Sequence, residues 1–262
     1  MAENQLDNLN YFDRQNEVAY MSYSQFKDFV ECEAMALAIL EGRYEKPKSD
    51  ALLQGSYVDA YFSGELDQFK TDNPSLFKKD GTLLAKYEVC ESVIKAVEED
   101  PAFKAFFLSG ETQRIFTGFI AGVPFKGKID MLYDDRIVDM KCMADIAPKW
   151  NEEERRKVPF YTYYGYQIQA AIYQELVRLN TGKKLPYYLA VMTKTDPVEK
   201  HAFQFSQEVL DKALMLVKTL APHFQAVKNH EEEPTECGHC KYFASTHKFD
   251  IFDIKTITEE DM

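Results

Sequence analysis

Apolar residues recur at helical spacing over much of the chain. A first helix is expected to begin at Ser22 or Ser24, which are good N-cap residues, and to end at Gly42. A second helix is expected over residues 50–62, with Gly64 closing it. Later helices are expected near residues 85–99, 101–108, 161–180 and 207–229.

Strand patterns occupy the middle of the chain. The run from Gly122 to Lys141 has two apolar-rich segments around the polar tetrapeptide Tyr133-Asp134-Asp135-Arg136, which predicts a hairpin with an Asp-rich turn. Other strands are expected over residues 113–120, 185–194 and 201–205, and loops over residues 65–84 and 150–157. The order of helix, three-stranded meander, helix and strand predicts a mixed α/β fold.

Both strands of the hairpin carry an acid near the same end. The side-chain period of two places Asp139 and Lys141 on one face of their strand, with Val138 and Met140 on the other. Two carboxylates close together repel unless a cation lies between them, and oxygen ligands favour Mg²⁺ or Mn²⁺. Asp130, Asp139 and Lys141 therefore outline a metal-dependent hydrolysis site. Taken alone, they are more simply explained by an ordinary hairpin with exposed acids and a surface ion pair.

Further motifs strengthen the first interpretation. Gly-x-x-Asp ending at Asp130, followed by Asp-x-Lys at Asp139 and Lys141, resembles the PD-(D/E)XK nuclease superfamily. Downstream, Gln169 and Tyr173 resemble the Gln-x-x-x-Tyr motif of its lambda-exonuclease and RecB-like branch. Residues 52–60 resemble the early helix of that branch, with Asp59 where a histidine is usual.

The matching order of these motifs spans roughly residues 22–230. The chain looks most similar to phage or prophage exonucleases that work with a single-strand annealing protein. This resemblance implies a restriction-endonuclease-like core, in which helices flank a central mixed β-sheet, with an N-terminal helical region. It also implies digestion of double-strand DNA ends to produce single strands for recombination.

The resemblance implies roles for the acidic residues and the lysine. Asp130 and Asp139 would ligate Mg²⁺ or Mn²⁺ together with the backbone carbonyl of Met140, and Asp59 would complete or tune a second site. Lys141 would position the attacking water. The same fold without activity, binding DNA ends or a recombination partner, is the alternative function, which the replacement at Asp59 favours.

DNA contacts are expected downstream of the hairpin. Gln169 and Tyr173 are four residues apart, so they share a helical face and can both point at a DNA backbone or at the metal site. The basic run Arg155-Arg156-Lys157 precedes that helix and is the best candidate for backbone contacts, although a solvated loop is the simpler explanation of such a run taken singly.

The net charge of −12 argues against a nucleic-acid enzyme, because phosphate binding draws on lysine and arginine clusters. Bound metals offset several acids locally. A homo-oligomeric ring could also hold DNA by topology with a thin basic lining, so a homo-oligomer is expected.

The segment Cys237-Gly238-His239-Cys240 has ligand chemistry of its own, because two thiolates at this spacing can grip one metal. In related nucleases, three C-terminal cysteines and one from the first helix hold an iron–sulfur cluster, and Cys32 occupies that helical position. Phe243 stands where the third C-terminal cysteine is expected. His239 or His247 as a substitute would give a zinc or altered cluster site. With this set incomplete, the sequence favours a metal-free knuckle.

Composition sets the outer limits. The 262 residues, 45% of them hydrophobic, suffice for one core, and we expect a flexible arm over residues 1–20, one nuclease-like domain over 21–248 and a tail over 249–262. The sequence has no run of eighteen apolar residues and no basic-plus-apolar leader, so no membrane association is expected. Five cysteines then indicate reduced thiols and a cytoplasmic location, bacterial or in a phage-infected host.

Overall fold

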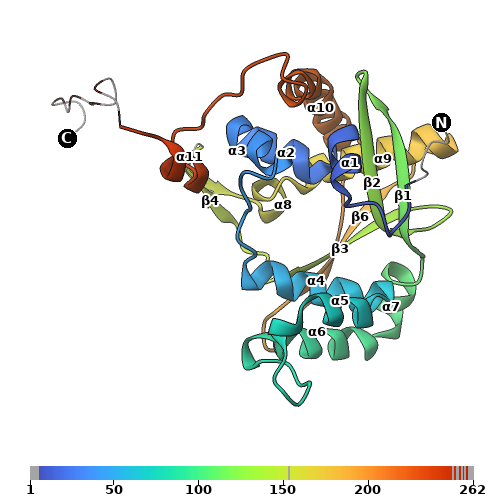
Figure 1. Cartoon of the computed structure of the whole chain (residues 1–262). Helices are drawn as coiled ribbons and strands as arrows, with labels where there is room; N and C mark the ends of the chain where they lie inside the picture. The colour runs from blue at the N-terminus through green and yellow to red at the C-terminus, as the bar shows by residue number, and fades with distance from the viewer. Residues whose placement is uncertain are drawn as a thin grey trace.

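A five-stranded sheet lies between two layers of helices (Figure 1). The computed structural model describes residues 6–152 and 154–249, together with residues 251, 254, 256 and 258. The strand order is β1-β2-β3-β6-β7, with β3 and β6 parallel and the other neighbours antiparallel. Its strands are β1 (Glu111–Ile120), β2 (Val123–Leu132), β3 (Ile137–Met143), β6 (Tyr187–Thr193) and β7 (Lys200–Gln204). The predicted α/β core with a central mixed sheet is thus confirmed.

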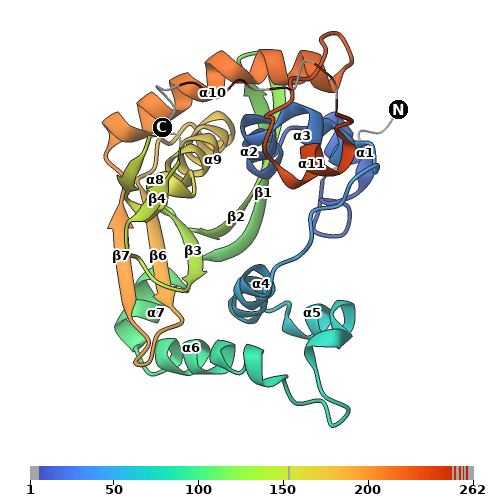
Figure 2. The ribbon, with the colours of Figure 1, turned by 90° about the vertical axis from the view of Figure 1, so that its left-hand side faces the viewer.

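The two helical layers come from different parts of the sequence (Figure 2). One face carries α1 (Arg14–Ala19), α2 (Tyr23–Glu31), α3 (Glu33–Leu40), α9 (Tyr166–Thr181) and α10 (Gln207–Lys228). The other face carries α4 (Asp50–Ser63), α5 (Leu66–Asp72), α6 (Val89–Glu98) and α7 (Pro101–Phe107). Smaller elements are the 3-10 turns Pro74–Leu76 and Ala85–Tyr87, the hairpin of β4 (Lys149–Asn151) and β5 (Arg156–Val158), α8 (Phe160–Tyr163) and α11 (Lys241–Thr246). No helix in the described part of the chain has the length and apolar character that a membrane span requires.

The sheet buries an apolar core on each face. Ile137 and Met143 of β3 pack in the core covered by α9 and α10, whereas Val138 and Met140 pack in the core covered by α4 and α6. The predicted alternation along this strand is therefore confirmed. As a result, Asp139 lies on the α9 side of the sheet, beneath that helix.

The capping residues act as their chemistry predicts. Ser22 Oγ accepts a hydrogen bond of 3.2 Å from Gln25 N–H at the start of α2, and Gly64 ends α4 with a left-handed φ of 79°. The prediction of a single helix from Ser22 to Gly42 is wrong, however. It divides at Cys32, which is extended with φ −169° and serves as the C-cap of α2 and the N-cap of α3.

Three segments expected to be irregular contain regular structure. Residues 65–84 include α5, residues 150–157 include the β4–β5 hairpin, and α1 forms within residues 1–20. α1 is held by contacts distant in sequence, from Lys126 and Lys228. α5 packs on the neighbouring α4, and β4 and β5 pair with each other, so turn signals do not exclude short regular elements. Residues 1–5 and most of residues 249–262 lie outside the described residues, and the proposed domain division stays a prediction.

Two buried lysines hold α1 against the rest of the protein. Lys126 on β2 is fully buried, and its Nζ lies 2.7 Å from Glu17 Oε1. Lys228 at the end of α10 donates to the backbone carbonyls of Glu17 and Tyr20, each at 2.7 Å, and to Gln25 Oε1 at 2.9 Å. Their hydrogen bonds offset the cost of burying two ammonium groups and join β2, α1, α2 and α10.

Gly127 lets α9 approach β2 closely. A Cβ at this position would lie 2.9 Å from Leu176 Cδ1 and 3.1 Å from Tyr173 Cδ1, both on α9. Those distances are shorter than normal van der Waals contact, so glycine sets the separation between this helix and the strand that carries Asp130.

Gly127→Ala is expected to lower the free energy of unfolding by about 1–3 kcal/mol, because the added methyl group overpacks a filled site. Urea unfolding measures it. The matched control is Gly55→Ala in α4, where the nearest atom to an added Cβ is Cys142 O at 3.9 Å. Alanine in a helix interior should leave stability unchanged or raise it by up to about 1 kcal/mol. Equal losses in both variants would contradict this account.

A histidine clamp gives stability a defined pH dependence. His223 on α10 pairs through Nε2 with Glu33 Oε1 at 2.9 Å and through Nδ1 with Glu232 Oε2 at 2.5 Å. Hydrogen bonds to Glu33 and Glu232 raise the pKa of His223 above its ordinary value of 6.5. Because the pKa of His223 is higher in the folded protein than in the unfolded chain, its paired imidazolium stabilises the fold fully below pH 6.5. This stabilisation is lost as the pH rises through the pKa of His223 in the folded protein.

The His223→Gln variant should therefore be less stable than the parent by a larger margin near pH 6 than near pH 8. Urea unfolding of both proteins at the two pH values measures this margin. Groups that titrate alike in parent and variant cancel when the two free energies of unfolding are subtracted. A margin that is the same at both pH values would exclude the clamp as the source.

Candidate active site

Strands β2 and β3 separate where the acids lie. Their ladder consists of the pairs Met131–Val138 and Leu132–Ile137. Beyond it, the N–H of Met140 donates a hydrogen bond of 2.9 Å to Asp130 Oδ2 rather than to a backbone carbonyl of β2. The N–H and C=O of one strand residue point to the same side, so the Met140 carbonyl also faces the gap between the two strands.

Asp139 is held from two sides. It is almost fully buried, with 1% of its surface exposed. Gln169 Nε2, on α9, donates a 2.9 Å hydrogen bond to Asp139 Oδ1, and Lys141 Nζ lies 2.5 Å from Oδ2. The fold therefore brings Asp139 and Lys141 together with Gln169, the first residue of the Gln-x-x-x-Tyr motif.

These groups border a cleft of about 450 Å³ between the two helical layers. Its polar lining comes from α4, β2, β3, the segment joining α8 to α9, and the end of β6: Ser56, Asp59, Asp130, Lys141, Tyr164, Tyr166 and Lys194. Met140 also lines it. Asp59, predicted from the early helix motif, thus lines the same cleft as Asp130 of the hairpin.

Carboxyl groups crowd around Lys141 in and beside the cleft. Burial, then the charges of Asp139 and Asp59, raise the pKa of Asp130 well above its usual range. Burial raises the pKa of Asp59 to about 6, although Lys141 opposes the shift. For Lys141, burial would lower the pKa, but the carboxylates of Asp139 and Asp130 outweigh it and raise the pKa. The Lys141 ammonium therefore lies among three carboxyl groups, and Lys194 is a second lysine of the cleft lining.

The donor set fits a hard divalent cation. Asp139 Oδ2 is buried and accepts no hydrogen bond of normal geometry from a described residue, so it keeps lone-pair capacity beside the Lys141 ammonium. Carboxylate and carbonyl oxygens are the ligands that Mg²⁺ and Mn²⁺ prefer. Among the described residues, the three aspartates do not form a set with ligand atoms all within 4.8 Å of one another, so they do not surround one point at that spacing.

The other predicted residues lie around the cleft rather than in its lining. Tyr173 is buried against Gly127, one turn along α9 from Gln169. Asp139, Gln169 and Tyr173 are not lining residues of the cleft.

The basic run lies on the β4–β5 hairpin, which follows β3 and leads into α8 (Figure 2). Arg155, Arg156 and Lys157 are all exposed. Arg156 pairs with Glu154, with its Nε 2.7 Å from Glu154 Oε2. Arg155 and Lys157 make no ion pair with a described residue, so both have charge available for a ligand.

Three residues in or beside the cleft escape the sequence motifs. Lys194 Nζ donates to Gln54 Oε1 at 2.7 Å and lines the cleft directly after β6. Tyr166 places its ring 5.2 Å from Lys141 Nζ. Tyr187 is buried on β6, and burial followed by the charge of Asp139 raises its pKa. A usable signal existed for Lys194, because β6 runs parallel to β3 and parallel strands end at the same edge.

A mixed sheet with an aspartate on β2, an Asp-x-Lys segment on β3 and a helix holding the second aspartate through glutamine is a PD-(D/E)XK-type core. The family model described as "PDDEXK-like domain of unknown function (DUF3799)" matches residues 22–246, and the chain belongs to this family. The predicted superfamily is therefore confirmed.

A solved structure supports the same assignment. The crystal structure of a "putative exonuclease" from Eubacterium rectale is 38% identical to this chain in sequence, with a TM-score of 0.90. The similarity covers 99% of this chain and 98% of that one. No curated protein matches the chain.

Asp130→Asn tests the charge crowding. The amide oxygen can still accept the Met140 N–H, while one buried like charge is removed, so the metal-free protein should gain about 0.5–2 kcal/mol in its free energy of unfolding. Thermal unfolding of the parent and the variant in EDTA measures this change in stability. Asp135→Asn, in the exposed turn of the same hairpin, should change stability by less than about 0.5 kcal/mol. A destabilised Asp130→Asn protein would show that the surroundings compensate the charge.

Proposed function

We propose that this protein is a divalent-metal-dependent DNA exonuclease that digests double-strand ends to leave single strands for recombination. The observation that carries the proposal is that Asp130 and Lys141 line one cleft of a PDDEXK-like domain, with Asp139 buried beside them and paired with Lys141. The name "putative exonuclease" of the Eubacterium rectale relative supports the end-directed form of the reaction. A phage or prophage origin, a single-strand annealing partner and homo-oligomerisation are proposals from the family resemblance.

The metal ligands would be Asp130, Asp139 and the Met140 carbonyl, with Asp59 beside them. Mg²⁺ or Mn²⁺ held there supplies a Lewis acid for a phosphoryl oxygen and lowers the pKa of a bound water. The protein's own part is to hold these oxygens in place. The Met140 N–H fixes Asp130, and Gln169 fixes one oxygen of Asp139 so that the other faces Lys141.

Lys141 has the position and charge for the reacting centre. Its ammonium is held between Asp139 and the ring of Tyr166, at 2.5 Å and 5.2 Å. From there it can orient a water molecule and stabilise negative charge that develops on phosphoryl oxygens. Asp139 thus serves both to bind the metal and to position the lysine.

DNA would be held by positive charge in the cleft and on the hairpin that follows β3. Lys194 lies in the cleft lining, and Arg155 and Lys157 lie exposed on the β4–β5 hairpin. These local charges offset the net charge of −12 where phosphates would lie. The hydrogen bond to Asp139 favours a positioning role for Gln169; direct strand contact by Gln169 and Tyr173 stays a prediction.

An inactive DNA-binding module is the second candidate function. It is favoured by Asp59, which stands where this branch usually has a histidine and whose pKa burial raises to about 6. The intact Asp130, Asp139 and Lys141 set opposes it.

The primary test is digestion of end-labelled linear duplex and of closed circular DNA with Mg²⁺, Mn²⁺ or EDTA. We expect metal-dependent loss of the linear DNA alone, reduced about 100-fold or more in Lys141→Ala because a preorganised charge is removed. The matched control Lys212→Ala removes an exposed lysine of α10, 74% exposed, and should keep full activity.

Asp139→Ala separates the two candidate functions. Loss of digestion with DNA binding retained supports the enzyme. Absence of digestion by the parent protein under every metal condition, with retained binding to DNA ends, supports the inactive module.

The salt dependence of DNA binding measures the contribution of the β4–β5 hairpin. The double variant Arg155→Ala/Lys157→Ala should bind duplex ends more weakly and lower the slope of log K against log salt by about 0.9 for each phosphate that the protein no longer neutralises. Lys95→Ala/Lys212→Ala removes the same charge from exposed sites elsewhere and should leave the slope unchanged. Equal slopes for all three proteins would place the DNA-binding surface outside the hairpin.

A further inference from the structure

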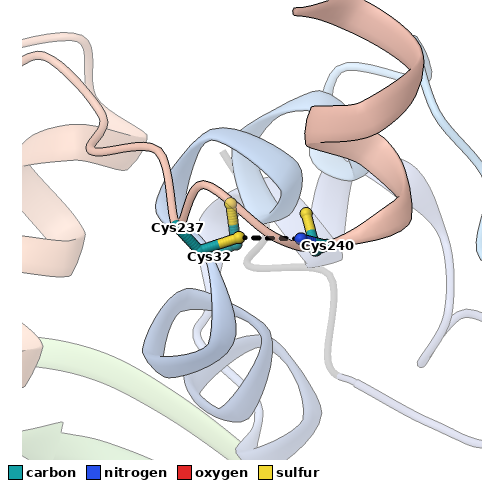
Figure 3. Close-up of side chains that lie close together, drawn as sticks. All are labelled: Cys32, Cys237 and Cys240. Atoms are coloured by element: carbon teal, nitrogen blue, oxygen red, sulfur yellow. Dashed lines mark hydrogen bonds between the residues drawn. The ribbon is translucent and has the colours of Figure 1, made fainter. Parts of the chain in front are cut away.

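Three cysteines distant in sequence meet beside α11. Cys32 comes from the junction of α2 and α3, Cys237 from the segment after α10, and Cys240 from the N-cap of α11 (Figure 3). Their sulfur atoms all lie within 4.8 Å of one another, and none of the three is in a disulfide. We call these three residues the thiol cluster. None of them lines the candidate active site.

Backbone N–H groups point at two of the sulfurs. Cys240 N–H donates to Cys237 Sγ and Phe243 N–H donates to Cys240 Sγ, each at 3.3 Å. Burial would raise the pKa of Cys237, but the N–H groups of His239 and Cys240 and the neighbouring thiols outweigh it and lower the pKa to about 7. Such donors stabilise sulfur in its charged form, which is the form that binds metals.

The sulfur spacing suits one metal ion. A Zn–S bond is about 2.3 Å, so two thiolates on one ion are at most about 4.6 Å apart, and about 3.8 Å apart in a tetrahedron. The cluster, within 4.8 Å, needs only a small contraction to reach this geometry. An iron–sulfur cluster with all-cysteine ligation needs four thiolates. Where the family resemblance expects the fourth, Phe243 stacks on His247 with ring centroids 4.4 Å apart.

The segment carrying two of the cysteines is held by a small set of contacts. Within the six residues of α11, only Tyr242 is buried, where it packs with Ala34, Met35 and Ala38 of α3 and with the ring of Tyr44. Thr235 exchanges hydrogen bonds with this region, from its N–H to Glu33 Oε2 at 2.9 Å and from Ala34 N–H to its carbonyl at 3.1 Å, and Arg43 Nη1 donates to the Tyr242 hydroxyl at 3.2 Å. A short helix with so little apolar burial is marginal, so a metal crosslink would add much of its stability.

We propose that the thiol cluster binds a single thiophilic divalent cation, Zn²⁺ in the simplest case, and clamps the segment from residue 235 to 247 onto α2 and α3. Among the described residues, no histidine or carboxylate joins the three sulfurs within 4.8 Å, so a solvent ligand completes the coordination. The cation is separate from the one proposed for the cleft, and its binding does not depend on the nuclease function.

Co²⁺ titration of the reduced, metal-free, full-length protein tests the proposal, because Co²⁺ reports thiolate ligation by a charge-transfer absorption. We expect one equivalent to bind with this absorption, Zn²⁺ to displace it, and Zn²⁺ to raise the thermal unfolding midpoint. Cys237→Ser and Cys240→Ser should each lose the absorption and the Zn²⁺-dependent shift. Cys90→Ala, which removes a buried cysteine outside the cluster, should keep both.

Three results would overturn the proposal. One is iron with acid-labile sulfide in the protein purified without oxygen. Another is Co²⁺ absorption that Cys237→Ser and Cys240→Ser leave intact. The third is absence of Co²⁺ absorption in the parent protein. Far-ultraviolet circular dichroism of each variant shows that the fold is kept, and Cys32→Ser serves as a further variant because its cysteine lies on a different segment.

Discussion

The early separation of β2 from β3 is the constraint on which the site depends. Had the ladder continued, β2 would have paired with the N–H and carbonyl of Met140. Instead the Asp130 carboxylate accepts the hydrogen bond from the Met140 N–H, and the Met140 carbonyl faces the gap between the strands. The cost is a group of like charges in a poorly solvated place, which a folded protein keeps only where the surroundings hold it. Here the holders are Lys141 and Gln169.

Both helical layers contribute to the cleft, so its geometry depends on how each packs on the sheet. α4 brings Asp59 from one layer, and α9 brings Tyr166 to the cleft and Gln169 to Asp139 from the other. Gly127 sets the distance of α9 from β2, while the buried Lys126 ties β2 to the N-terminal helices. Packing far from the reacting atoms therefore positions the groups that would bind metal and water.

The two proposed metal sites differ in donor chemistry. The cleft offers oxygen ligands, which suit hard cations, whereas the thiol cluster offers sulfur, which suits Zn²⁺ and other thiophilic ions. Such a division keeps each ion at its own site. It also separates the roles, since the thiol cluster joins the N-terminal helices to the segment after α10, while the cleft carries the charged groups of the nuclease core.

Local pattern was sufficient for the sheet hairpin, the alternation of Asp139 and Lys141 against Val138 and Met140, and the main helices, because periodicity and capping act within a few residues. Sequence alone did not reveal the break at Cys32, the small helix α5, or the positions of Lys194 in the cleft and Tyr187 near Asp139. The break at Cys32 and the positions of Lys194 and Tyr187 depend on partners far along the chain, whereas α5 packs on the neighbouring α4. Which donor faces which carboxylate, and how closely three cysteines approach, are consequences of packing that only the tertiary structure decides.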